Sequence, residues 1–222
     1  DLPDAVDTNC LMFADDVKIY RRIKCIEDCD FLQKQLDAVY QWSLRWKLSL
    51  NPSKCKVLTL SLRRAPLLST YVLAGEPLDR INEMRDLGIV LDEKLTFAAH
   101  IDQVVRKASR ALGLMMRSFQ TGKHGRSFYQ CDAKAIVSVY CANVRSIMEY
   151  GSVIWGGAAE CHVKRLECVQ FKFLTWLSAR CRTGVPLRYD ELLRHFRLST
   201  LLGRRRQHDL LVFFYGMCTA ML

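Results

Sequence analysis

The sequence predicts an α+β chain in which a mixed part, residues 1–95, is followed by a mostly helical part, residues 96–222. Short apolar runs bounded by turn residues, which are typical of strands, are confined to the first part. The second part instead repeats apolar residues at intervals of three and four, which is typical of amphipathic helices. The 222 residues are 50% hydrophobic and 25% charged, which excludes a disordered or collagen-like chain.

The first predicted elements are a hairpin and a helix. The hairpin strands Cys10–Phe13 and Val17–Tyr20 are apolar, are expected to be buried, and are separated only by Ala14, Asp15 and Asp16. The helix is expected next, because apolar residues recur on one helical face; they are Leu32, Leu36, Val39, Tyr40 and Trp46. It has to end before Asn51-Pro52, since proline removes a backbone donor and clashes with the preceding turn.

Short strands and then long helices are predicted for the rest of the chain. Strands are expected at 54–62 and 87–91, and a short strand at 71–73 leads into a turn at 74–77. The clearest helical pattern comes next, with Ile101, Val104, Val105, Ala108, Leu112, Met115 and Met116 on its apolar side. Further helices are expected at 132–147, at 162–177 and from Tyr189 onward, and the basic segment 121–126 is expected to be a connection.

The net charge of +10 is divided unevenly along the chain. Residues 1–100 carry 14 basic and 15 acidic side chains, whereas residues 101–222 carry 19 basic and 8 acidic ones. A basic surface gains free energy by releasing the counterions of a polyanion, so the second part is the candidate nucleic-acid-binding part. Arg106, Lys107 and Arg110 lie on the polar side of its first helix. An idle, solvated basic surface is the alternative.

The cysteines and the apolar runs exclude other classes of protein. The ten cysteines include no CxxC pair, so no zinc framework is predicted, and free thiols in a reducing compartment are expected. The longest uncharged run, 210–222, is too short to cross a bilayer. No signal peptide is predicted, because the first residues lack a basic leader followed by a long apolar run.

The adjacent carboxylates Asp15 and Asp16 have the clearest catalytic potential. Adjacent carboxylates repel each other, and a divalent cation relieves that repulsion. Magnesium binds carboxylates, keeps several waters and bridges to substrate phosphates, and two-metal phosphoryl transfer uses such carboxylates. A solvated turn is the alternative, because aspartate is common in turns.

Phe13-Ala14-Asp15-Asp16 is the first of several motifs that follow one another along the chain. It is followed by Leu-Asn-Pro-Ser-Lys-Cys at 50–55, Asp-Leu-Gly-Ile-Val-Leu-Asp at 86–92 and Met-Glu-Tyr-Gly at 148–151. In this order the motifs resemble the C-terminal part of the reverse transcriptase of non-LTR (LINE-type) retrotransposons. The resemblance implies a partial polymerase palm that contains the Asp-Asp hairpin, at 1–95, and a helical thumb and post-thumb region at 96–222.

The resemblance also implies a role for each matching residue. Asp15 and Asp16 match the metal-site pair of the palm, with Asp15 as the more direct ligand. Phe13 stands beside the primer end, where many members of the family have tyrosine. Lys54 matches a lysine that is a candidate to protonate the leaving pyrophosphate, and a solvated lysine at a strand edge is the alternative.

The resemblance also implies how the primer is supported, which partners are bound and whether the chain contains every catalytic residue. Leu87 and Gly88 match the hairpin that supports the primer, where glycine allows close backbone approach. The implied partners are an RNA template, a DNA primer and deoxynucleotides, with Mg²⁺ as cofactor, in the nucleus or cytoplasm. The family's third metal-binding aspartate has no match in the twelve residues before Phe13, so the chain alone is expected to be inactive or nearly so.

Two other functional classes remain possible for the chain, and the tryptophans and the basic run 204–206 need separate interpretation. The chain could be a non-enzymatic nucleic-acid-binding module, or a decayed or domesticated remnant of a retroelement. Trp42, Trp46 and Trp176 are predicted to pack in cores rather than to stack on bases, because of their helical spacing. The basic run 204–206 is expected either to contact phosphate or to form a solvated helix face.

Overall fold

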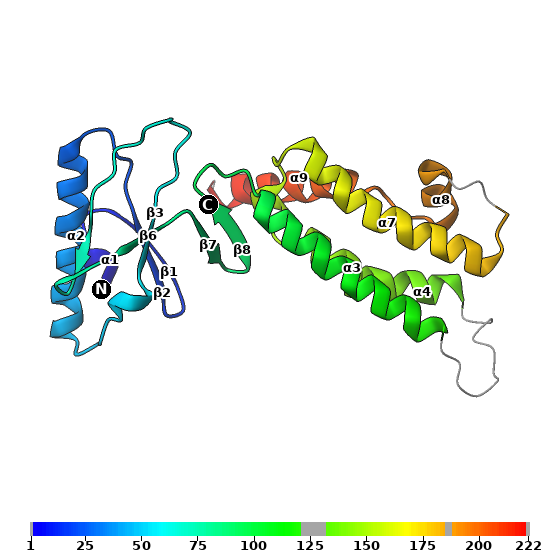
Figure 1. Ribbon diagram of the computed structural model, residues 1–222, viewed down its shortest axis with the longest axis horizontal. Coiled ribbons are helices and arrows are strands. Elements are labelled where there is room, and N and C mark those ends of the chain that lie inside the picture. The colour runs from blue at the N-terminus through cyan, green and yellow to red at the C-terminus, as the bar shows by residue number, and fades with distance from the viewer. Residues whose placement is uncertain (1, 121–131, 185–187, 221–222) are drawn as a thin grey trace. The chain divides into compact units, whose positions relative to one another are not determined.

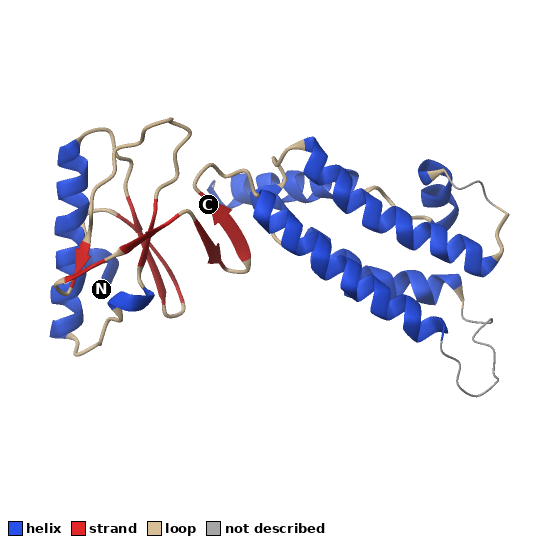
Figure 2. Cartoon of the chain, viewed as in Figure 1, coloured by secondary structure: helices blue, strands red, loops and turns tan. Residues whose placement is uncertain are grey.

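The computed structural model describes residues 2–120, 132–184 and 188–220 (Figure 1). These residues form two compact units: Asp1–Arg85 with Asp92–Leu95, and Asp86–Leu91 with Thr96–Leu222. Helices occur beside small two-stranded sheets, so the predicted α+β class is confirmed (Figure 2). The segment 121–126, predicted to be a connection, lies outside the described residues.

The first unit contains the predicted hairpin and the predicted long helix. The elements are α1 (Leu2–Ala5), β1 (Asn9–Phe13), β2 (Asp16–Tyr20) and α2 (Ile26–Arg45). β1 and β2 pair antiparallel, from Asn9↔Tyr20 to Phe13↔Asp16. Leu2, Val6 and Val39 form a small core between α1 and α2, and Cys10 and Ile19 of the hairpin pack against it. The helices therefore cover the hairpin only at Cys10 and Ile19.

Local hydrogen bonds determine both ends of α2. At its start, Asp28 accepts hydrogen bonds from the Lys24 N–H at 2.9 Å and from Arg21 Nε at 3.0 Å. These bonds, the one from Lys24 first, lower the pKa of Asp28 to about 2. At its end, Lys47 adopts a left-handed φ of 54°, so the helix stops before Asn51-Pro52 as predicted. Trp46 follows the last helical residue and is 56% exposed, so the prediction of core packing is wrong for Trp46.

The other strands of the first unit are shorter than the sequence predicts. β3 (Lys56–Leu58) pairs in parallel with β6 (Asp79–Ile81), and β4 (Val72–Leu73) pairs antiparallel with β5 (Glu76–Pro77). The predicted strand at 54–62 is wrong outside 56–58. Residues Pro52–Lys54 form a 3-10 turn instead, because Lys54 N–H and Cys55 N–H bond back to the carbonyls of Asn51 and Pro52.

A second hairpin, β7 (Glu83–Asp86) with β8 (Ile89–Asp92), contains the predicted primer-support residues. Leu87 and Gly88 form its two-residue turn, with φ values of 44° and 87°. Two successive positive φ values match the twist of the flanking strands and favour glycine. The predicted strand at 87–91 therefore starts two residues later, because Leu87 and Gly88 are needed for the turn.

The second unit is mostly helical. Its helices are α3 (Ala98–Gln120), α4 (Ala133–Tyr140), α5 (Ser146–Glu149), α6 (Ser152–Trp155), α7 (Glu160–Cys181), α8 (Tyr189–Phe196) and α9 (Leu201–Ala220). The predicted helix at 162–177 is confirmed. The single helix predicted from Tyr189 onward is two helices, because Arg197 adopts a φ of 55° and the Leu198 N–H bonds back to the Leu193 carbonyl.

A π-helical segment, Cys141–Arg145, joins α4 to α5 within the predicted helix at 132–147. A stripe of residues spaced by four runs through this segment, and each of its members is fully buried: Ile136, Tyr140, Val144 and Met148. The wider turn of a π-helix adds a residue to the α-helical repeat and so rotates the following side chains. The segment thereby keeps the whole stripe directed at the core.

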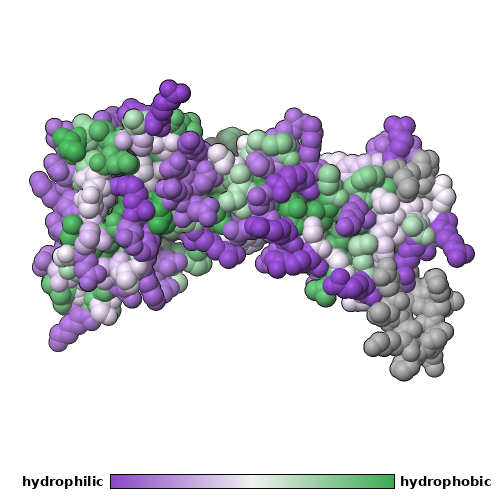
Figure 3. Space-filling model, in the orientation of Figure 1, coloured by the Kyte–Doolittle hydropathy of each residue, from purple (hydrophilic) through white to green (hydrophobic). Residues whose placement is uncertain are grey.

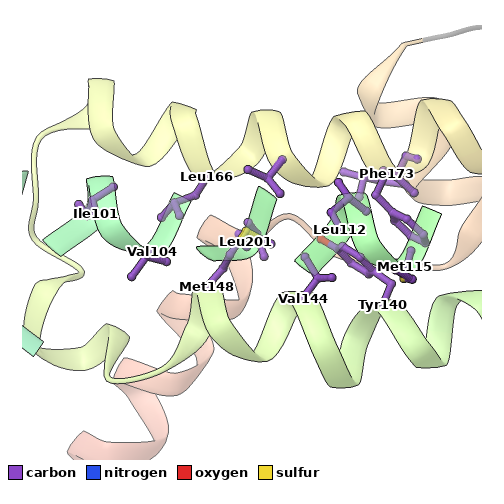
Figure 4. Close-up of a cluster of buried hydrophobic side chains, with 14 of the residues drawn as sticks. Ile101, Val104, Leu112, Met115, Tyr140, Val144, Met148, Leu166, Phe173 and Leu201 are labelled. Atoms are coloured by element: carbon purple, nitrogen blue, oxygen red, sulfur yellow. The ribbon is translucent and has the colours of Figure 1, made fainter. Parts of the chain in front are cut away.

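The core of the second unit lies between α3, α4 and α7, which run side by side (Figure 4). α3 contributes Ile101 and Leu112, and α7 contributes Leu166 and Phe173, all of them at most 1% exposed. The rings of Tyr140 and Phe173 stack at 3.9 Å. Burying each such side chain contributes about 1.5–3 kcal/mol relative to exposure. Trp176 packs at the edge of this core and Trp42 at that of the first unit, as predicted.

Side-chain hydrogen bonds of Gln170 and Glu167 join α8 and the start of α9 to α7. The side chain of Gln170, which is fully buried, donates to the Tyr189 hydroxyl at 2.8 Å and to the Ser199 carbonyl at 3.0 Å. Glu167 accepts a hydrogen bond from the Leu202 N–H at 2.9 Å and another from the Tyr189 hydroxyl. Burial, followed by the hydrogen bond to Glu167, raises the pKa of Tyr189. Since an unpaired buried polar group is costly, these bonds fix where α9 begins.

Candidate nucleic-acid and metal site

The tip of the first hairpin brings the two aspartates together. Ala14 and Asp15 form the turn, with Ala14 at a left-handed φ of 53°, and Asp16 is the first residue of β2, paired with Phe13. Both carboxylates are exposed. Their oxygens are ligands of the kind that Mg²⁺ prefers, together with waters and phosphate oxygens. The described part of the chain contains no cluster of three His, Cys, Asp or Glu side chains able to hold a metal, so the pair supplies only part of such a site.

The hairpin strands are more exposed than the sequence predicts. Residues on one face of a strand alternate, so Leu11 and Phe13 lie on the face opposite Cys10. Leu11 is 56% exposed and Phe13 is 60% exposed. The expected burial is therefore wrong for this face. It is also wrong for Met12 and Val17 on the other face, where only Cys10 and Ile19 pack against the small core. Phe13 and Asp16, as paired residues, share the uncovered face.

Lys54 belongs to the same unit as the two aspartates. It ends the 3-10 turn Pro52–Lys54, and its side chain is exposed. No hydrogen bond or ion pair joins it to Asp15 or Asp16 in the described structure.

In the second unit, the predicted phosphate-binding residues lie on the surface of α3. Arg106, Lys107 and Arg110 are exposed, whereas Ala108 and Leu112 between and after them are buried. The amphipathic pattern of the sequence thus correctly places these three cations outside the core. Figure 3 shows hydrophilic and hydrophobic residues interspersed over the visible face of the helical part.

The basic run 204–206 is not a solvated helix face as a whole, because two of its three arginines have partners within the second unit. Arg204 is paired with the carboxylate of Glu149, with Nη2 to Oε2 at 3.0 Å, and this bond raises the pKa of Arg204. Arg205 is 2% exposed and lies over the Trp155 ring at 5.5 Å, and burial lowers its pKa. Only Arg206 is exposed. Three successive arginines do not reveal which of them faces the core from α9, so the sequence did not predict the contacts of Arg204 and Arg205 within the unit.

Tyr150 contacts the predicted primer-support turn of the second unit, and sequence reasoning did not identify this contact. Its hydroxyl donates a hydrogen bond to the Leu87 carbonyl at 2.8 Å. The available signal was the motif Met-Glu-Tyr-Gly at 148–151, which belongs to the reverse-transcriptase resemblance. Nothing in the motif, however, indicated that Tyr150 reaches the turn of the second hairpin, 63 residues earlier in the chain.

Comparison with curated proteins gives relatives that share one activity in their names. The chain is 31% identical over 200 residues to the probable RNA-directed DNA polymerase from transposon BS of Drosophila melanogaster, covering 88% of this chain and 21% of that protein. It is 29% identical over 205 residues to the probable RNA-directed DNA polymerase from transposon X-element of the same species, covering 89% of this chain and 21% of that protein. It is 29% identical over 169 residues to the RNA-directed DNA polymerase from mobile element jockey of Drosophila funebris. This match covers 75% of this chain and 18% of that protein.

The chain spans about a fifth of the length of these relatives. No protein-family model matches it, and no solved structure matches it. The exposed Asp-Asp hairpin and the similarity over most of the chain define a segment of a mobile-element nucleic-acid polymerase. The family is that of the RNA-directed DNA polymerases of non-LTR (LINE-type) retrotransposons, and the chain belongs to it. None of the helices in the described ranges is long and apolar enough to cross a membrane.

Proposed function

We propose that the chain is the segment of a reverse transcriptase that comprises the C-terminal part of the palm, at 1–95, and the thumb and post-thumb region, at 96–222. The observation that carries this proposal is the first hairpin, which holds Asp15 in its exposed turn and Asp16 opposite Phe13 at the start of β2. It occurs in a chain that is 27–31% identical to RNA-directed DNA polymerases over most of its length.

In the full-length polymerase, Asp15 and Asp16 would hold Mg²⁺ together with a third carboxylate supplied by another part of the protein. When bound, the ions neutralise charge that develops as the primer hydroxyl attacks the α-phosphate of a deoxynucleotide and pyrophosphate leaves. Asp15, at the turn, would be the more direct ligand, and Asp16 would support it from the first position of β2. The exposed carboxylate oxygens and the lack of a covering side chain fit such an ion.

Other residues of the chain act on the primer and the leaving group. Phe13 packs beside the primer end, and its ring offers no hydroxyl there. Lys54 donates a proton from Nζ to the pyrophosphate as it leaves, which is the role of a general acid. Leu87 and Gly88 support the primer backbone at the turn of the second hairpin.

The RNA template and DNA primer are held mainly by their backbones. Arg106, Lys107 and Arg110 contact phosphates from the exposed side of α3. Such contacts position a duplex without reading its sequence, and an RNA-containing duplex presents A-form geometry whose shape the protein recognises.

A metal-ligand variant of the full-length polymerase tests this proposal. Asp15→Asn keeps the size of the side chain and removes its charge, so primer extension on an RNA template should fall by several orders of magnitude. Asp30→Asn, at an exposed position on α2, is the matched control and should keep wild-type activity. Equal activity of the two variants would show that Asp15 is not a metal ligand.

A non-enzymatic nucleic-acid-binding module is the second candidate, favoured by the exposed cations of α3. On this view the chain binds duplex, and the aspartates form a solvated turn. The Asp15→Asn variant separates the two functions, because a binding module loses neither affinity nor any activity when Asp15 is neutralised.

A further inference from the structure

The turn Leu87–Gly88 is held by a neighbouring segment of its own unit. The Tyr150 hydroxyl donates a hydrogen bond to the Leu87 carbonyl at 2.8 Å. The Tyr150 ring lies against Gly88, since a Cβ added to Gly88 would be 3.2 Å from Tyr150 Cε1. Gly88 also has a φ of +87°, which disfavours any other residue. The ring and the hydroxyl of Tyr150 therefore contact both residues of the turn.

Gly151 allows this close approach. It has a φ of +61°, and a Cβ there would lie 2.6 Å from Ile89 Cδ1 at the start of β8. A side chain at this position would displace the Ile89 side chain and strain the left-handed backbone of residue 151. Tyr150 itself is 59% exposed, so its burial does not account for its position. Its specific contacts are with the turn.

One hydrogen bond, one ion pair and one cation–π contact surround the backbone at Tyr150. Trp155 is fully buried, and its Nε1 donates a hydrogen bond to the Tyr150 carbonyl at 2.9 Å. Arg205 of α9 lies over the Trp155 ring, and Arg204 binds the carboxylate of Glu149, the residue before Tyr150. A charge-assisted, two-point bond of this kind holds its partners in one geometry. The start of α9 is thus connected to the hairpin turn through residues 149–155.

We propose that Tyr150 is a positioning residue for the turn Leu87–Gly88, and that the Glu149–Arg204 and Trp155–Arg205 pairs hold Tyr150 in place. This inference rests on the proposed function of the turn as the support of the primer. Tyr150 acts through the Leu87 carbonyl. Loss of its hydroxyl weakens primer binding at the turn and does not change the metal site or the phosphoryl-transfer step.

The first experiment measures the turn in this chain without any polymerase assay. Tyr150→Phe removes one hydroxyl and keeps the ring, so the protein is expected to fold. Amide hydrogen exchange at Gly88, Ile89 and Val90 should become about fivefold faster, as expected for the loss of one net hydrogen bond. Tyr40→Phe, on α2, is the control and should change none of these rates. Unchanged exchange in the Tyr150→Phe chain would overturn the inference.

The second experiment measures the consequence for the primer in the full-length polymerase. Tyr150→Phe should raise the KM for the primer about fivefold and change kcat by less than about twofold. A fall in kcat with an unchanged KM would refute the positioning role, because it would place Tyr150 in the chemical step. If the wild-type polymerase extends no primer, the proposed function fails, whereas the hydrogen-exchange result still decides whether Tyr150 holds the turn.

Discussion

Two residues have different roles in the proposed chemistry: Asp15 is a metal ligand and Lys54 is a proton donor. Lys54→Ala in the full-length polymerase should reduce kcat on the order of 10²-fold, as is typical for the loss of a general acid. Asp15→Ala should cost several orders of magnitude, because the ligand cannot be replaced by water in the same geometry. Single-turnover primer extension measures both effects. A larger loss for Lys54→Ala than for Asp15→Ala would contradict the assigned roles.

Glu149 should be the most sensitive charged residue of the second unit. Its side chain is 11% exposed and binds Arg204, and Arg145 Nε lies 3.8 Å away. Glu149→Gln leaves these guanidinium groups without their anion, so urea unfolding should show a loss of about 1.5–3 kcal/mol. Glu160→Gln is the control, because its pair with Lys164 is exposed and is worth less than about 1 kcal/mol. Equal losses would show that the Glu149–Arg204 pair is not a specific support.

At the scale of elements, α3 carries the prediction for nucleic-acid binding. Replacing Arg106, Lys107 and Arg110 together by Gln should reduce the log–log salt slope of RNA–DNA duplex binding by nearly one unit per lost phosphate contact. A titration at three salt concentrations measures the slope. The same number of exposed cations on the first unit, Lys34, Arg45 and Lys47, provides the control triple variant. Equal slopes for wild type and the α3 variant would leave α3 with a packing role alone.

The start of α2 should be sensitive to acid. The folded pKa of Asp28 is about 2, below its ordinary value near 3.9. The ionised carboxylate therefore stabilises the folded state above about pH 4, and this stabilisation is lost as the pH falls toward about 2. Asp28→Asn should lower the thermal midpoint of the chain at pH 6, and the difference from wild type should narrow by pH 3. A difference that does not depend on pH would exclude Asp28 as the cause.

The same elements show how far the sequence could predict the structure. α3 was correctly predicted from the strong periodicity of its apolar residues, and the strands of the first hairpin from two apolar runs around a short turn, although their burial was not. The sequence placed Lys54 in a strand, whereas it ends a 3-10 turn that begins at Pro52. This turn is closed by backbone hydrogen bonds, which leave no pattern of side chains in the sequence. Arg204 and Arg205 were misread, since their partners Glu149 and Trp155 lie about fifty residues away. Contacts of that range depend on tertiary packing.

At the scale of the whole molecule, the chain alone is expected to be inactive. It presents two carboxylates at the hairpin tip, but its described residues contain no third ligand near them. The purified chain should therefore incorporate no deoxynucleotide on a primed RNA template with Mg²⁺, while residues 96–222 still provide the duplex-binding surface. Binding without synthesis is the expected combination, measured by gel extension and by fluorescence anisotropy on the same duplex. Clear incorporation would show that the chain contains a complete active site.

The π-helical segment Cys141–Arg145 has a consequence for insertions and deletions among related chains. In an α-helix each step of four residues advances the side-chain direction by about 40°, so a stripe such as Ile136, Tyr140, Val144 and Met148 would drift away from the core. Deleting one residue between Cys141 and Arg145 changes the spacing of that stripe from four-four-four to four-three-four, which suits an uninterrupted α-helix. A relative that is one residue shorter at this place should therefore bury the same side chains, and length variation there should be better tolerated than in α3 or α7.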